Sequence, residues 1–462
     1  MPANKFKNKV IIGRISLAGR KGGFFMPEGK EGRENETPIA GEYLNTAMTG
    51  DRVEIEDGKV LRVLERSRTH FSGTVKIIGD KVWLKPYDTK VYSDILVTPD
   101  SSIILNDSER IVVEMTHWDK LEGRVIKKLG IAGDNETEMG TIMFEHKIQY
   151  DFPEAVKKEA EETAKRAIPT EEIAKRKDFR NVLTFTIDPD TAKDFDDALS
   201  YQVLPDGKIE LGVHIADVSY FVRPGSAIDT EAKERATSVY LVDRTIPMLP
   251  EVLSNGLCSL VPNQDRLTFS AVFILDRSGK IHDKWFGKTI IHSSQRFTYE
   301  DVDKILETGQ GPLVKELMDI NDIAKKIRAE RMAKGAMAFD SDDVKFDLDA
   351  TGKPIGIIRT ISTDSHRLIE EYMLMANKNV AESIFYKKSA KGGNGKHTFV
   401  YRIHDAPNQE KISDLRNFLK KFDYDFGKDK VLTSKKLNDL ILAAEDKPEE
   451  RLVKASILRS MS

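Results

Sequence analysis

The first 150 residues consist of short β-rich runs interrupted by Gly, Pro and Asp, and this pattern narrows the choice of fold. The run KVIIGRISL is followed by GGFFMP, and no helix-period stretch lies between residues 8 and 66. RVEIEDGKVLRVLE predicts a hairpin, because Asp57-Gly58 between two alternating runs is a strong turn signal. Residues 70–150 have the same character. We therefore expect two consecutive small all-β barrels rather than one large sheet.

The chain changes character after residue 150. Residues 151–180 are charged and predict a helical connector that Pro169 interrupts. From residue 181 onward strand-like and helix-like segments mix, which predicts an α+β domain. The expected domains are therefore 1–67, 68–150, 151–180 and 181–462. In the last domain the expected strands are VLTFTID, KIELGVHIAD, LTFSAVFILD, KWFGKTIIHS and VKFDLD, and the expected helices are 300–308, 312–335, 364–386, 408–423 and 434–445.

Composition excludes several classes of protein. The 462 residues are 40% hydrophobic and 32% charged, which is typical of a globular chain. No run approaches ~18 apolar residues, and the N-terminus lacks the apolar core of a signal peptide, so we expect neither a membrane span nor secretion. The single cysteine, Cys258, excludes a disulfide framework and a cysteine-based zinc site. Together these features predict a cytoplasmic protein.

The net charge of −3 hides a local gradient. Residues 1–33 carry eight Lys or Arg and two Asp or Glu. A basic segment on a nearly neutral chain can be the electrostatic footprint of a phosphate-binding surface. A solvated basic tail is the alternative.

The most informative string is TFTIDPDTAKDFDDALS. An apolar, β-branched run ends at Asp188, and Asp194, Asp196 and Asp197 follow within nine residues. Asp196 and Asp197 are neighbours and must point in different directions, so Asp188 and Asp194 can approach one of them across the loop. Four carboxylates in one loop repel each other unless a cation offsets them.

The oxygen-only character of this cluster indicates which ion would suit it. Mg²⁺ and Mn²⁺ prefer hard oxygen ligands, and two such ions can support phosphodiester hydrolysis. A structural calcium loop and a solvated acidic turn are the alternatives. The spacing does not follow the D-x-[DN]-x-[DN]-G pattern of an EF-hand, and a solvated turn seldom lies between two strongly apolar strands.

Longer motifs resemble a known family. TIDPDTAKDFDDAL, HIADVSYFVRPGSAID, ATSVYLVDRTIPMLPEVLSNGLCSL, HRLIEEYMLMAN and YRIHDAPN closely resemble, in order, the RNB catalytic domain of the ribonuclease II/ribonuclease R family. The resemblance covers residues 181–462, and GRISLAGRKGGFFMPE favours the ribonuclease R branch. It implies a multidomain chain in which two small all-β OB-fold (cold-shock-like) barrels precede an α+β RNB-type catalytic domain.

The resemblance also implies an activity. Members of the family are processive 3′→5′ hydrolytic exoribonucleases that release nucleoside 5′-monophosphates with Mg²⁺. The implied substrate is single-stranded or 3′-tailed structured RNA. By motif match, Asp188, Asp194 and Asp197 are the expected metal ligands, Asp196 is the expected critical catalytic carboxylate, and Glu371 is expected near the RNA 3′ end.

Three aromatic residues fall on family positions that contact RNA. Tyr240 and Phe339 match a pair that stacks the terminal bases, and Tyr299 matches a third active-site aromatic. Core packing is the alternative for each of them. In the first barrel, Phe24 and Phe25 are adjacent on a strand, so at most one of them can meet RNA.

Other distinctive residues predict structural roles. His214 and Asp217 in HIADVS are expected to form a buried, hydrogen-bonded pair, and Cys258 is expected in the core.

One departure from the family pattern concerns the end of the chain. An SPIRRYPDL-like stretch with a phosphate-binding arginine, a C-terminal OB-fold and a basic tail are absent from the sequence, so we expect a fragment or a shortened member. The apolar stripe Val453, Ile457 and Met461 predicts a helix that lacks a full packing surface. An RNA-binding protein with an RNB-like body but no turnover is the alternative function.

Overall fold

The computed structural model describes residues 9–19, 21–98, 102–337, 343–387, 397–403, 409–424 and 433–461. The chain divides into two compact units. The first unit contains residues 1–152 with two short segments from later in the chain, 239–246 and 348–353. The second unit contains the remaining residues.

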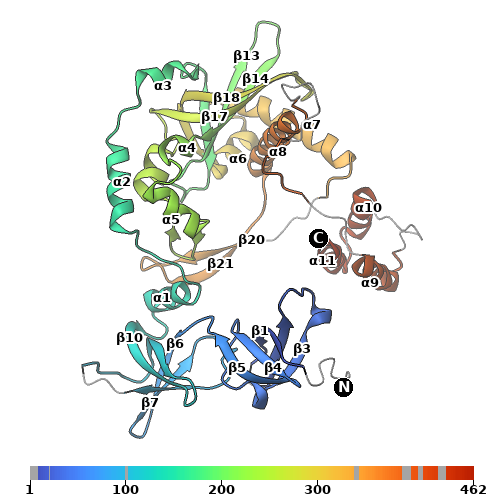
Figure 1. Ribbon diagram of the computed structural model, residues 1–462. Helices are drawn as coiled ribbons and strands as arrows, with labels where there is room; N and C mark the ends of the chain where they lie inside the picture. The colour runs from blue at the N-terminus through green and yellow to red at the C-terminus, as the bar shows by residue number, and fades with distance from the viewer. Residues whose placement is uncertain are drawn as a thin grey trace. The chain divides into compact units, whose positions relative to one another are not determined.

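The first unit begins with two five-stranded β-structures, as the sequence predicts (Figure 1). In the second of them the order is β10-β8-β7-β6-β9, and the sheet closes into a barrel with β10 parallel to β8. This is the Greek-key order of an OB-fold. The strands of both structures are β1 (Ile11–Leu17), β2 (Gly22–Pro27), β3 (Thr37–Ala40), β4 (Arg52–Glu56), β5 (Lys59–Glu65), β6 (His70–Ile78), β7 (Lys81–Pro86), β8 (Ile95–Thr98), β9 (Glu109–His117) and β10 (Glu122–Ile131).

The first β-structure has the OB-fold order without its closing pair. Its strands run β3-β2-β1-β4-β5, so β3 and β5 are the edges among the described residues. The edge strand β3 spans only four residues and includes Pro38, which has no N–H to donate to a closing partner. Short helical turns at Arg33–Asn35 and Gly41–Tyr43 flank it.

A buried ion pair joins the two β-structures. Asp51 is fully buried and accepts hydrogen bonds from the Met48 N–H (2.9 Å), the Ser67 N–H (2.8 Å) and Arg66 Nη1 (2.8 Å). The Arg66 guanidinium also lies 3.7 Å from the ring centroid of Trp118 in the second barrel. Because the buried apolar residues on both sides form one cluster, the two structures share a continuous core.

A helix and a hairpin complete the first unit. The sequence did not predict this helix, α1, because its segment carries no apolar stripe long enough to set a helical period. Arg244 of the hairpin donates to Glu136 of α1 (3.0 Å), and Asn135 donates to Asp243 of the hairpin (2.7 Å). The elements are α1 (Asn135–Glu145), β15 (Val239–Tyr240) and β16 (Thr245–Ile246).

The second unit is built on a seven-stranded sheet in the order β11-β18-β17-β14-β13-β12-β19. Most neighbours are antiparallel, but β11 runs parallel to β18, and β12 runs parallel to β19. The turns at Asp206-Gly207 and Ser278-Gly279 connect strands as the sequence predicts. The strands are β11 (Lys177–Phe179), β12 (Thr184–Asp188), β13 (Asp197–Val203), β14 (Ile209–Ala216), β17 (Asp265–Leu275), β18 (Ile281–His292) and β19 (Gln295–Thr298).

Three helices cover one face of this sheet, and their apolar sides form the main core of the unit with the inward residues of the strands. They are α6 (Tyr299–Thr308), α7 (Val314–Ala333) and α8 (Asp364–Phe385). Thr298 caps α6 through a hydrogen bond from the Asp301 N–H to Thr298 Oγ1 (3.0 Å), and the helix ends at Gly309 with φ 65°. These helices agree with the sequence prediction to within two residues at each end.

The predicted connector is only partly helical. Two helices form as expected, but Lys177–Phe179 becomes strand β11 and extends the central sheet. The reason is a parallel ladder with β18 that a local sequence pattern does not reveal. The connector helices are α2 (Glu154–Ala164) and α3 (Thr170–Ala174). The other elements up to residue 360 are α4 (Val218–Phe221), α5 (Ala227–Arg235), a π-helical turn at Val252–Leu257, β20 (Asp343–Leu348) and β21 (Pro354–Thr360).

The last three helices correct one expectation. Val453 and Ile457 do lie on a helix, but both are fully buried, and Met461 is packed against the same cluster. The prediction that this stripe lacks a packing surface was wrong, because the two preceding helices supply one. The elements are α9 (Gln409–Leu419), a 3₁₀ turn at Lys420–Phe422, α10 (Ser434–Ala444) and α11 (Glu450–Ser460).

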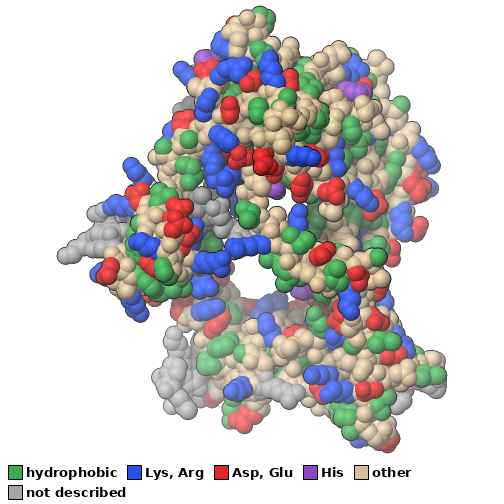
Figure 2. Space-filling view, turned by 180° about the vertical axis from the view of Figure 1, so that it is seen from behind, with side chains coloured by type: hydrophobic (Ala, Val, Ile, Leu, Met, Phe, Trp, Pro, Cys, Tyr) green, Lys and Arg blue, Asp and Glu red, His purple; other side chains and the backbone are tan. Residues whose placement is uncertain are grey.

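The surface mixes charges of both signs. Figure 2 shows basic and acidic side chains interspersed over the face that it presents, as the net charge of −3 leads one to expect. Among the described residues, no helix is both long and apolar enough to cross a lipid bilayer.

Candidate active site

The aspartate loop is fixed at both ends by the central sheet. Asp188 is the last residue of β12 and pairs with Thr298 of β19 in parallel register. Asp197 is the first residue of β13 and pairs with Ile215 of β14. Pro189 follows Asp188 and cannot continue a ladder as a donor. The loop between the two strands therefore leaves and re-enters the sheet at defined positions.

Hydrogen bonds hold the middle of the loop. The Phe195 N–H donates to Ser259 Oγ (3.0 Å), and Ser259 Oγ donates to the Lys193 carbonyl (2.8 Å). The Leu260 N–H donates to the Phe195 carbonyl (2.9 Å). Ser259 is fully buried, so these bonds are shielded from water. They hold the backbone on either side of Asp194.

Arg296 holds the start of the loop. Its Nη2 donates to the carbonyls of Pro189 (2.8 Å) and Asp190 (3.0 Å), and its guanidinium lies 5.5 Å from the ring centroid of Phe195. Arg296 lies on β19, next to β12. Its positive charge also acts against the raised pKa of Asp188.

Asp188, Asp196 and Asp197 have raised pKa values. Burial raises the pKa of Asp188 to about 6, and the charges of Asp194 and Asp196 add to this effect. Burial also raises the pKa of Asp197 to about 7, with further contributions from Asp188 and Asp196. Partial burial and the charge of Asp194 raise the pKa of Asp196. The four carboxylates thus act on one another and form a single electrostatic group.

Their exposure differs. Asp188 is 7% exposed, and its Oδ2 is buried without a hydrogen-bond partner. Asp196 is the more exposed of the two adjacent aspartates, which confirms that they face different surroundings. Asp190, in the same loop, has a side chain 82% exposed and lies outside the group. A buried carboxylate oxygen without a donor is costly unless a cation or proton neutralises it.

The charges of the aspartate group favour a divalent cation, but the positions of its side chains do not form a complete ligand set. The unpartnered oxygen of Asp188 and the repulsion within the group both favour a bound positive charge. Among the described residues, however, no three Asp, Glu, His or Cys side chains converge at the spacing of metal ligands. The expected ligands Asp188, Asp194 and Asp197 are therefore close but not preassembled. Mg²⁺ commonly binds through one or two carboxylates, with water and substrate phosphate completing its shell.

Tyr299 lies beside this group. It is the first residue of α6, and burial raises the pKa of Tyr299 to about 12, with contributions from the charges of Asp197 and Asp188. Its ring stacks on the His366 imidazole with centroids 4.0 Å apart and planes 10° apart. Tyr299 also packs against the main core, as the core-packing alternative expects, and its contact with RNA stays a prediction.

Glu371 lies in an ion pair. Its side chain is 1% exposed on α8, and its carboxylate accepts hydrogen bonds from Arg331 of α7, one of them from Nε at 3.1 Å. Arg328 lies 3.8 Å away, and Glu371 lines a hollow of about 310 Å³ between the two helices. The neighbouring Glu370 is more exposed, at 49%, and also contacts Arg331. The role of Glu371 near an RNA end stays a prediction.

The two expected base-stacking residues lie outside the unit that holds the aspartates or outside the described residues. Tyr240 belongs to the first unit, on β15, and is 70% exposed, so core packing does not describe it. Phe339 lies outside the described residues. Their pairing in an aromatic clamp remains a prediction.

The residues expected to be structural are buried, with one correction. His214 and Asp217 do not bond to each other. His214 Nδ1 bonds Ser270 Oγ (2.6 Å), whereas Asp217 pairs with Arg176 (2.7 Å). Burial lowers the pKa of His214 to about 3. Cys258 is 4% exposed, and burial raises the pKa of its thiol to about 12, which is typical of a core cysteine.

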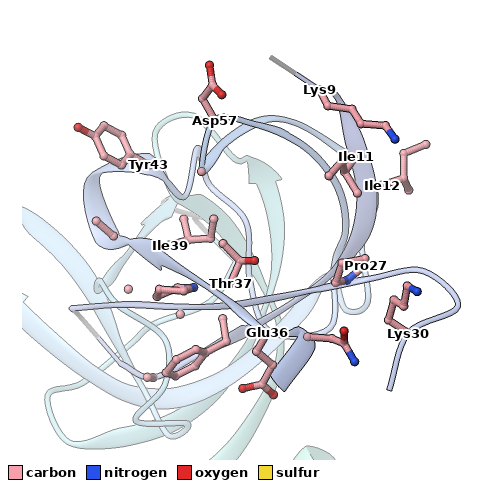
Figure 3. Close-up of a pocket in the computed structure, with 18 of the residues that line it drawn as sticks. Lys9, Ile11, Ile12, Pro27, Lys30, Glu36, Thr37, Ile39, Tyr43 and Asp57 are labelled. Atoms are coloured by element: carbon pink, nitrogen blue, oxygen red, sulfur yellow. The ribbon is translucent and has the colours of Figure 1, made fainter. Parts of the chain in front are cut away.

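A separate groove lies on the first β-structure (Figure 3). It has a volume of about 1530 Å³, and Lys9, Lys21 and Lys30 line it together with exposed aromatic side chains. Phe24 is 43% exposed in this groove, whereas Phe25 is fully buried, which confirms that only one of the two can meet a ligand. Cations beside a flat ring are the features that single-stranded nucleic acid requires of a binding surface.

The sequence did not single out three residues of the site. They are Arg296, His366 and Arg331, and each contacts the aspartate loop or a predicted site residue from a strand or helix that lies elsewhere in the sequence. A partial signal exists for Arg296, which lies three residues before Tyr299. The parallel pairing of β12 with β19 is what brings it to the aspartate loop.

The comparisons with known proteins agree with this architecture. The RNB domain pattern matches residues 176–462, and the cold shock domain pattern matches residues 83–153. Ribonuclease R of Thermotoga maritima is 34% identical over 447 residues, which cover 92% of this chain and 62% of that protein. The chain therefore spans less than two thirds of the length of this relative.

Solved structures have a similar fold. Mycoplasma genitalium RNase R in complex with ribose-methylated single-stranded RNA matches with a TM-score of 0.87 and 25% identity, over 98% of this chain and 73% of that one. Yeast Ssd1, a pseudonuclease, matches with a TM-score of 0.68 and 20% identity, over 98% of this chain and 63% of that one. At that identity the likeness to Ssd1 shows the fold alone.

Proposed function

The chain belongs to the RNB-domain family, and we propose that it is a processive 3′→5′ exoribonuclease that hydrolyses RNA to nucleoside 5′-monophosphates. Its substrate would be single-stranded RNA or structured RNA with a single-stranded 3′ tail. The sole, buried cysteine is compatible with work in the cytoplasm. The observation that carries the proposal is the coupled aspartate group, in which Asp188 presents a buried, unpartnered oxygen.

A divalent cation, Mg²⁺ or Mn²⁺, would supply charge neutralisation and a polarised water at this group. Asp188, Asp194 and Asp197 are the residues that would hold it. We assign Asp196 the acceptance of the proton from the attacking water, because it is more exposed than Asp197 and its raised pKa makes it a better base. Arg296 and Ser259 keep the loop in place while the phosphate is positioned.

Other residues of the chain would bind the RNA. Stacking on an aromatic ring tolerates any base, so exposed Tyr240 and Phe24 suit an enzyme without sequence preference. The stacked pair Tyr299 and His366 forms a rigid wall beside the aspartates. Phosphate contacts from the lysines of the groove would supply affinity rather than catalysis.

The test is release of monophosphates from a 3′-tailed RNA. The wild-type protein should release nucleoside 5′-monophosphates from the 3′ end, and EDTA should stop the release. Asp196→Asn should lower the rate about 10²–10³-fold or more, because one charge is lost from the reacting centre. Its affinity for RNA should stay within about twofold, because that affinity is spread over many phosphate contacts.

The matched control is Asp190→Asn, which removes a carboxylate from the same loop but outside the coupled group. Its rate should remain near that of the wild type. Equal rates for the Asp196 and Asp190 variants would remove the aspartate group from the chemistry. Tight RNA binding with no EDTA-sensitive release by the wild-type protein would instead support the alternative, an RNA-binding protein without turnover.

A further inference from the structure

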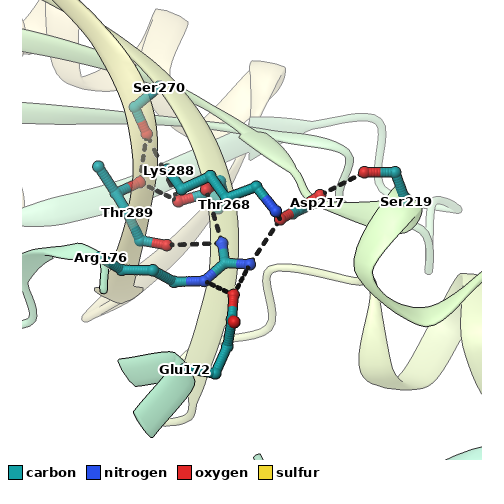
Figure 4. Close-up of polar contacts among 8 residues, drawn as sticks. All are labelled: Glu172, Arg176, Asp217, Ser219, Thr268, Ser270, Lys288 and Thr289. Atoms are coloured by element: carbon teal, nitrogen blue, oxygen red, sulfur yellow. Dashed lines mark hydrogen bonds and ion pairs between the residues drawn. The ribbon is translucent and has the colours of Figure 1, made fainter. Parts of the chain in front are cut away.

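Arg176 lies at the end of the predicted connector, yet its side chain is completely buried against the central sheet (Figure 4). Nη1 donates to the carbonyls of Thr268 (3.2 Å) and Thr289 (3.3 Å), which belong to adjacent strands β17 and β18. Nε donates to Glu172 of α3 (2.9 Å), and Nη2 donates to Asp217 (2.7 Å). One guanidinium therefore ties a connector helix, two strands and the segment after β14 together.

Asp217 is the buried partner in this network. Its side chain is 3% exposed, its Oδ1 accepts a hydrogen bond from Ser219 Oγ (2.8 Å), and Lys288 Nζ lies 3.7 Å from Oδ2. Burial alone would raise the pKa of Asp217, but the bonds from Arg176 and Ser219 outweigh it and hold the pKa below its usual range. Both carboxylate oxygens thus have donors, and the orientation of Asp217 is fixed.

The backbone connects Asp217 directly to the aspartate group. The Asp217 N–H donates to the Leu267 carbonyl (2.9 Å), and the N–H of the preceding residue, Ala216, donates to the Asp196 carbonyl (3.0 Å). One residue earlier, Ile215 pairs with Asp197 in the ladder between β14 and β13. A displacement of Asp217 is therefore transmitted through two residues to the backbone of Asp196 and Asp197.

We propose that Arg176 is a positioning residue that holds the end of β14, and through it Asp196 and Asp197, in the arrangement that hydrolysis requires. The inference rests on the proposed function. A buried ion pair is seldom the most stabilising way to fill a protein interior, because desolvation of the two charges offsets their attraction. Its directional bonds, however, fix geometry more tightly than apolar packing does. A misplacement of about 1 Å at a reacting centre can lower a rate about 10²-fold.

The test compares Arg176→Lys with the wild-type protein. Lysine keeps the charge but cannot bond Asp217, Glu172 and two carbonyls at once. We expect a 10–100-fold lower rate at saturating RNA and an increase of at least about threefold in the half-saturating Mg²⁺ concentration. Binding of Mn²⁺ to the RNA-free protein, followed by electron paramagnetic resonance, should weaken in parallel. The affinity for RNA should stay within about twofold.

Arg235→Lys is the matched control. Arg235 is also an arginine with a largely buried side chain, 8% exposed, and it pairs with Glu231 on α5. Its replacement should lower the melting temperature and leave the Mg²⁺ and Mn²⁺ dependences unchanged. Wild-type metal dependence in folded Arg176→Lys would overturn the proposal.

If Arg176→Lys does not fold, Asp217→Asn removes the same ion pair while keeping the shape of the side chain. Wild-type Mn²⁺ binding in folded Asp217→Asn would overturn the proposal equally. Absence of monophosphate release by the wild-type protein would instead overturn the proposed function. In that case the Mn²⁺ measurement still decides whether Arg176 positions the aspartates.

Discussion

At the scale of single residues, Asp197 combines a carboxylate with a site that disfavours its charge. Burial and the charges of Asp188 and Asp196 raise its pKa to about 7, against 3.8 for the free group. The folded state therefore prefers the protonated form. The contribution of protonated Asp197 to the stability of the fold is complete below about pH 4 and is lost as the pH rises through 7. In the absence of metal, ionised Asp197 should weaken the fold at alkaline pH.

The first prediction follows from this loss of stability when Asp197 ionises. Asp197→Asn should stabilise the metal-free protein about 1–2 kcal/mol more at pH 8 than at pH 5. The wild-type protein loses stability mainly between pH 5 and the pKa of about 7, and these two pH units correspond to at most about 2.7 kcal/mol, part of which solvent screens. Chemical unfolding at the two pH values measures the difference. Added Mg²⁺ should reduce the gain, because a cation would offset the repulsion that the substitution removes.

Asp190→Asn is the control for this measurement, because that side chain is 82% exposed in the same loop. It should leave the difference between the two pH values unchanged. An equal gain from both substitutions would mean that the effect reflects the net charge of the protein rather than the burial of Asp197.

The candidate residues show how far sequence reasoning reaches at this scale. The four aspartates could be found because they lie within ten positions of one another, and the structure places them in one electrostatic group. Arg296 and His366 could not be found, because each reaches the site through a strand or helix that only the fold brings near. The predicted pairing of His214 with Asp217 failed for the same reason, since their actual partners lie 56 and 41 residues away.

At the scale of elements, the hairpin β15–β16 is held by a cluster of charged and polar groups on α1. Arg244 Nη2 contacts Glu136 (2.5 Å) and Asp243 (2.6 Å), and Asn135 donates to Asp243 (2.7 Å). Tyr240 lies on the same hairpin. Partly exposed ion pairs contribute little to global stability, so this cluster is better suited to fixing the hairpin than to stabilising the unit.

The second prediction is that the cluster and Tyr240 act together. Arg244→Ala should lower the affinity for single-stranded RNA about 3–10-fold, and Tyr240→Ala about 5–150-fold, the usual range for one stacked base. In the Arg244→Ala background, Tyr240→Ala should cost less than in the wild type, because the ring is no longer held in place. Binding titrations of the four proteins complete the cycle.

Arg62→Ala is the control, because Arg62 forms an exposed pair with Glu54 on the first β-structure. It should change the affinity less than about twofold. If Tyr240→Ala costs the same in both backgrounds, the hairpin does not depend on its contacts with α1.

Elements with a strong period of their own could be predicted, and those defined by pairing could not. The helices at 299–308, 314–333 and 364–385 match the expected ones because each carries a continuous apolar stripe. The strand at 177–179 was assigned to the connector helix, and the one at 295–298 was not anticipated. Both are short and are defined by parallel partners far along the chain.

At the scale of the whole molecule, the two units carry different parts of the proposed function. The first unit has a groove lined by Lys9, Lys21 and Lys30, and the second unit has the coupled aspartates. Basic side chains on a groove act mainly through release of the counterions of the phosphates. In the proposed function the aspartates would act on the reaction and contribute little to affinity. Substitutions in the two units should therefore affect different measured quantities.

The third prediction tests this separation through salt and rate together. Replacing the three groove lysines with Gln should lower the affinity for single-stranded RNA and reduce the slope of log K against log salt by about 2, since each lost phosphate contact contributes about 0.7. The rate at saturating RNA should stay near that of the wild type. Replacing Lys157, Lys208 and Lys233 of the second unit with Gln makes the same change in net charge and should leave the slope unaltered.

The groove variant can be combined with Asp196→Asn in one protein. Groups in separate units with no shared partner usually contribute independently, so the triple lysine change should weaken binding by the same factor in both backgrounds. Asp196→Asn should likewise lower the rate by the same factor whether or not the lysines are present. A fall in the rate at saturating RNA when only the lysines are changed would show that the groove also positions RNA for hydrolysis. The separation of binding and chemistry between the two units would then be wrong.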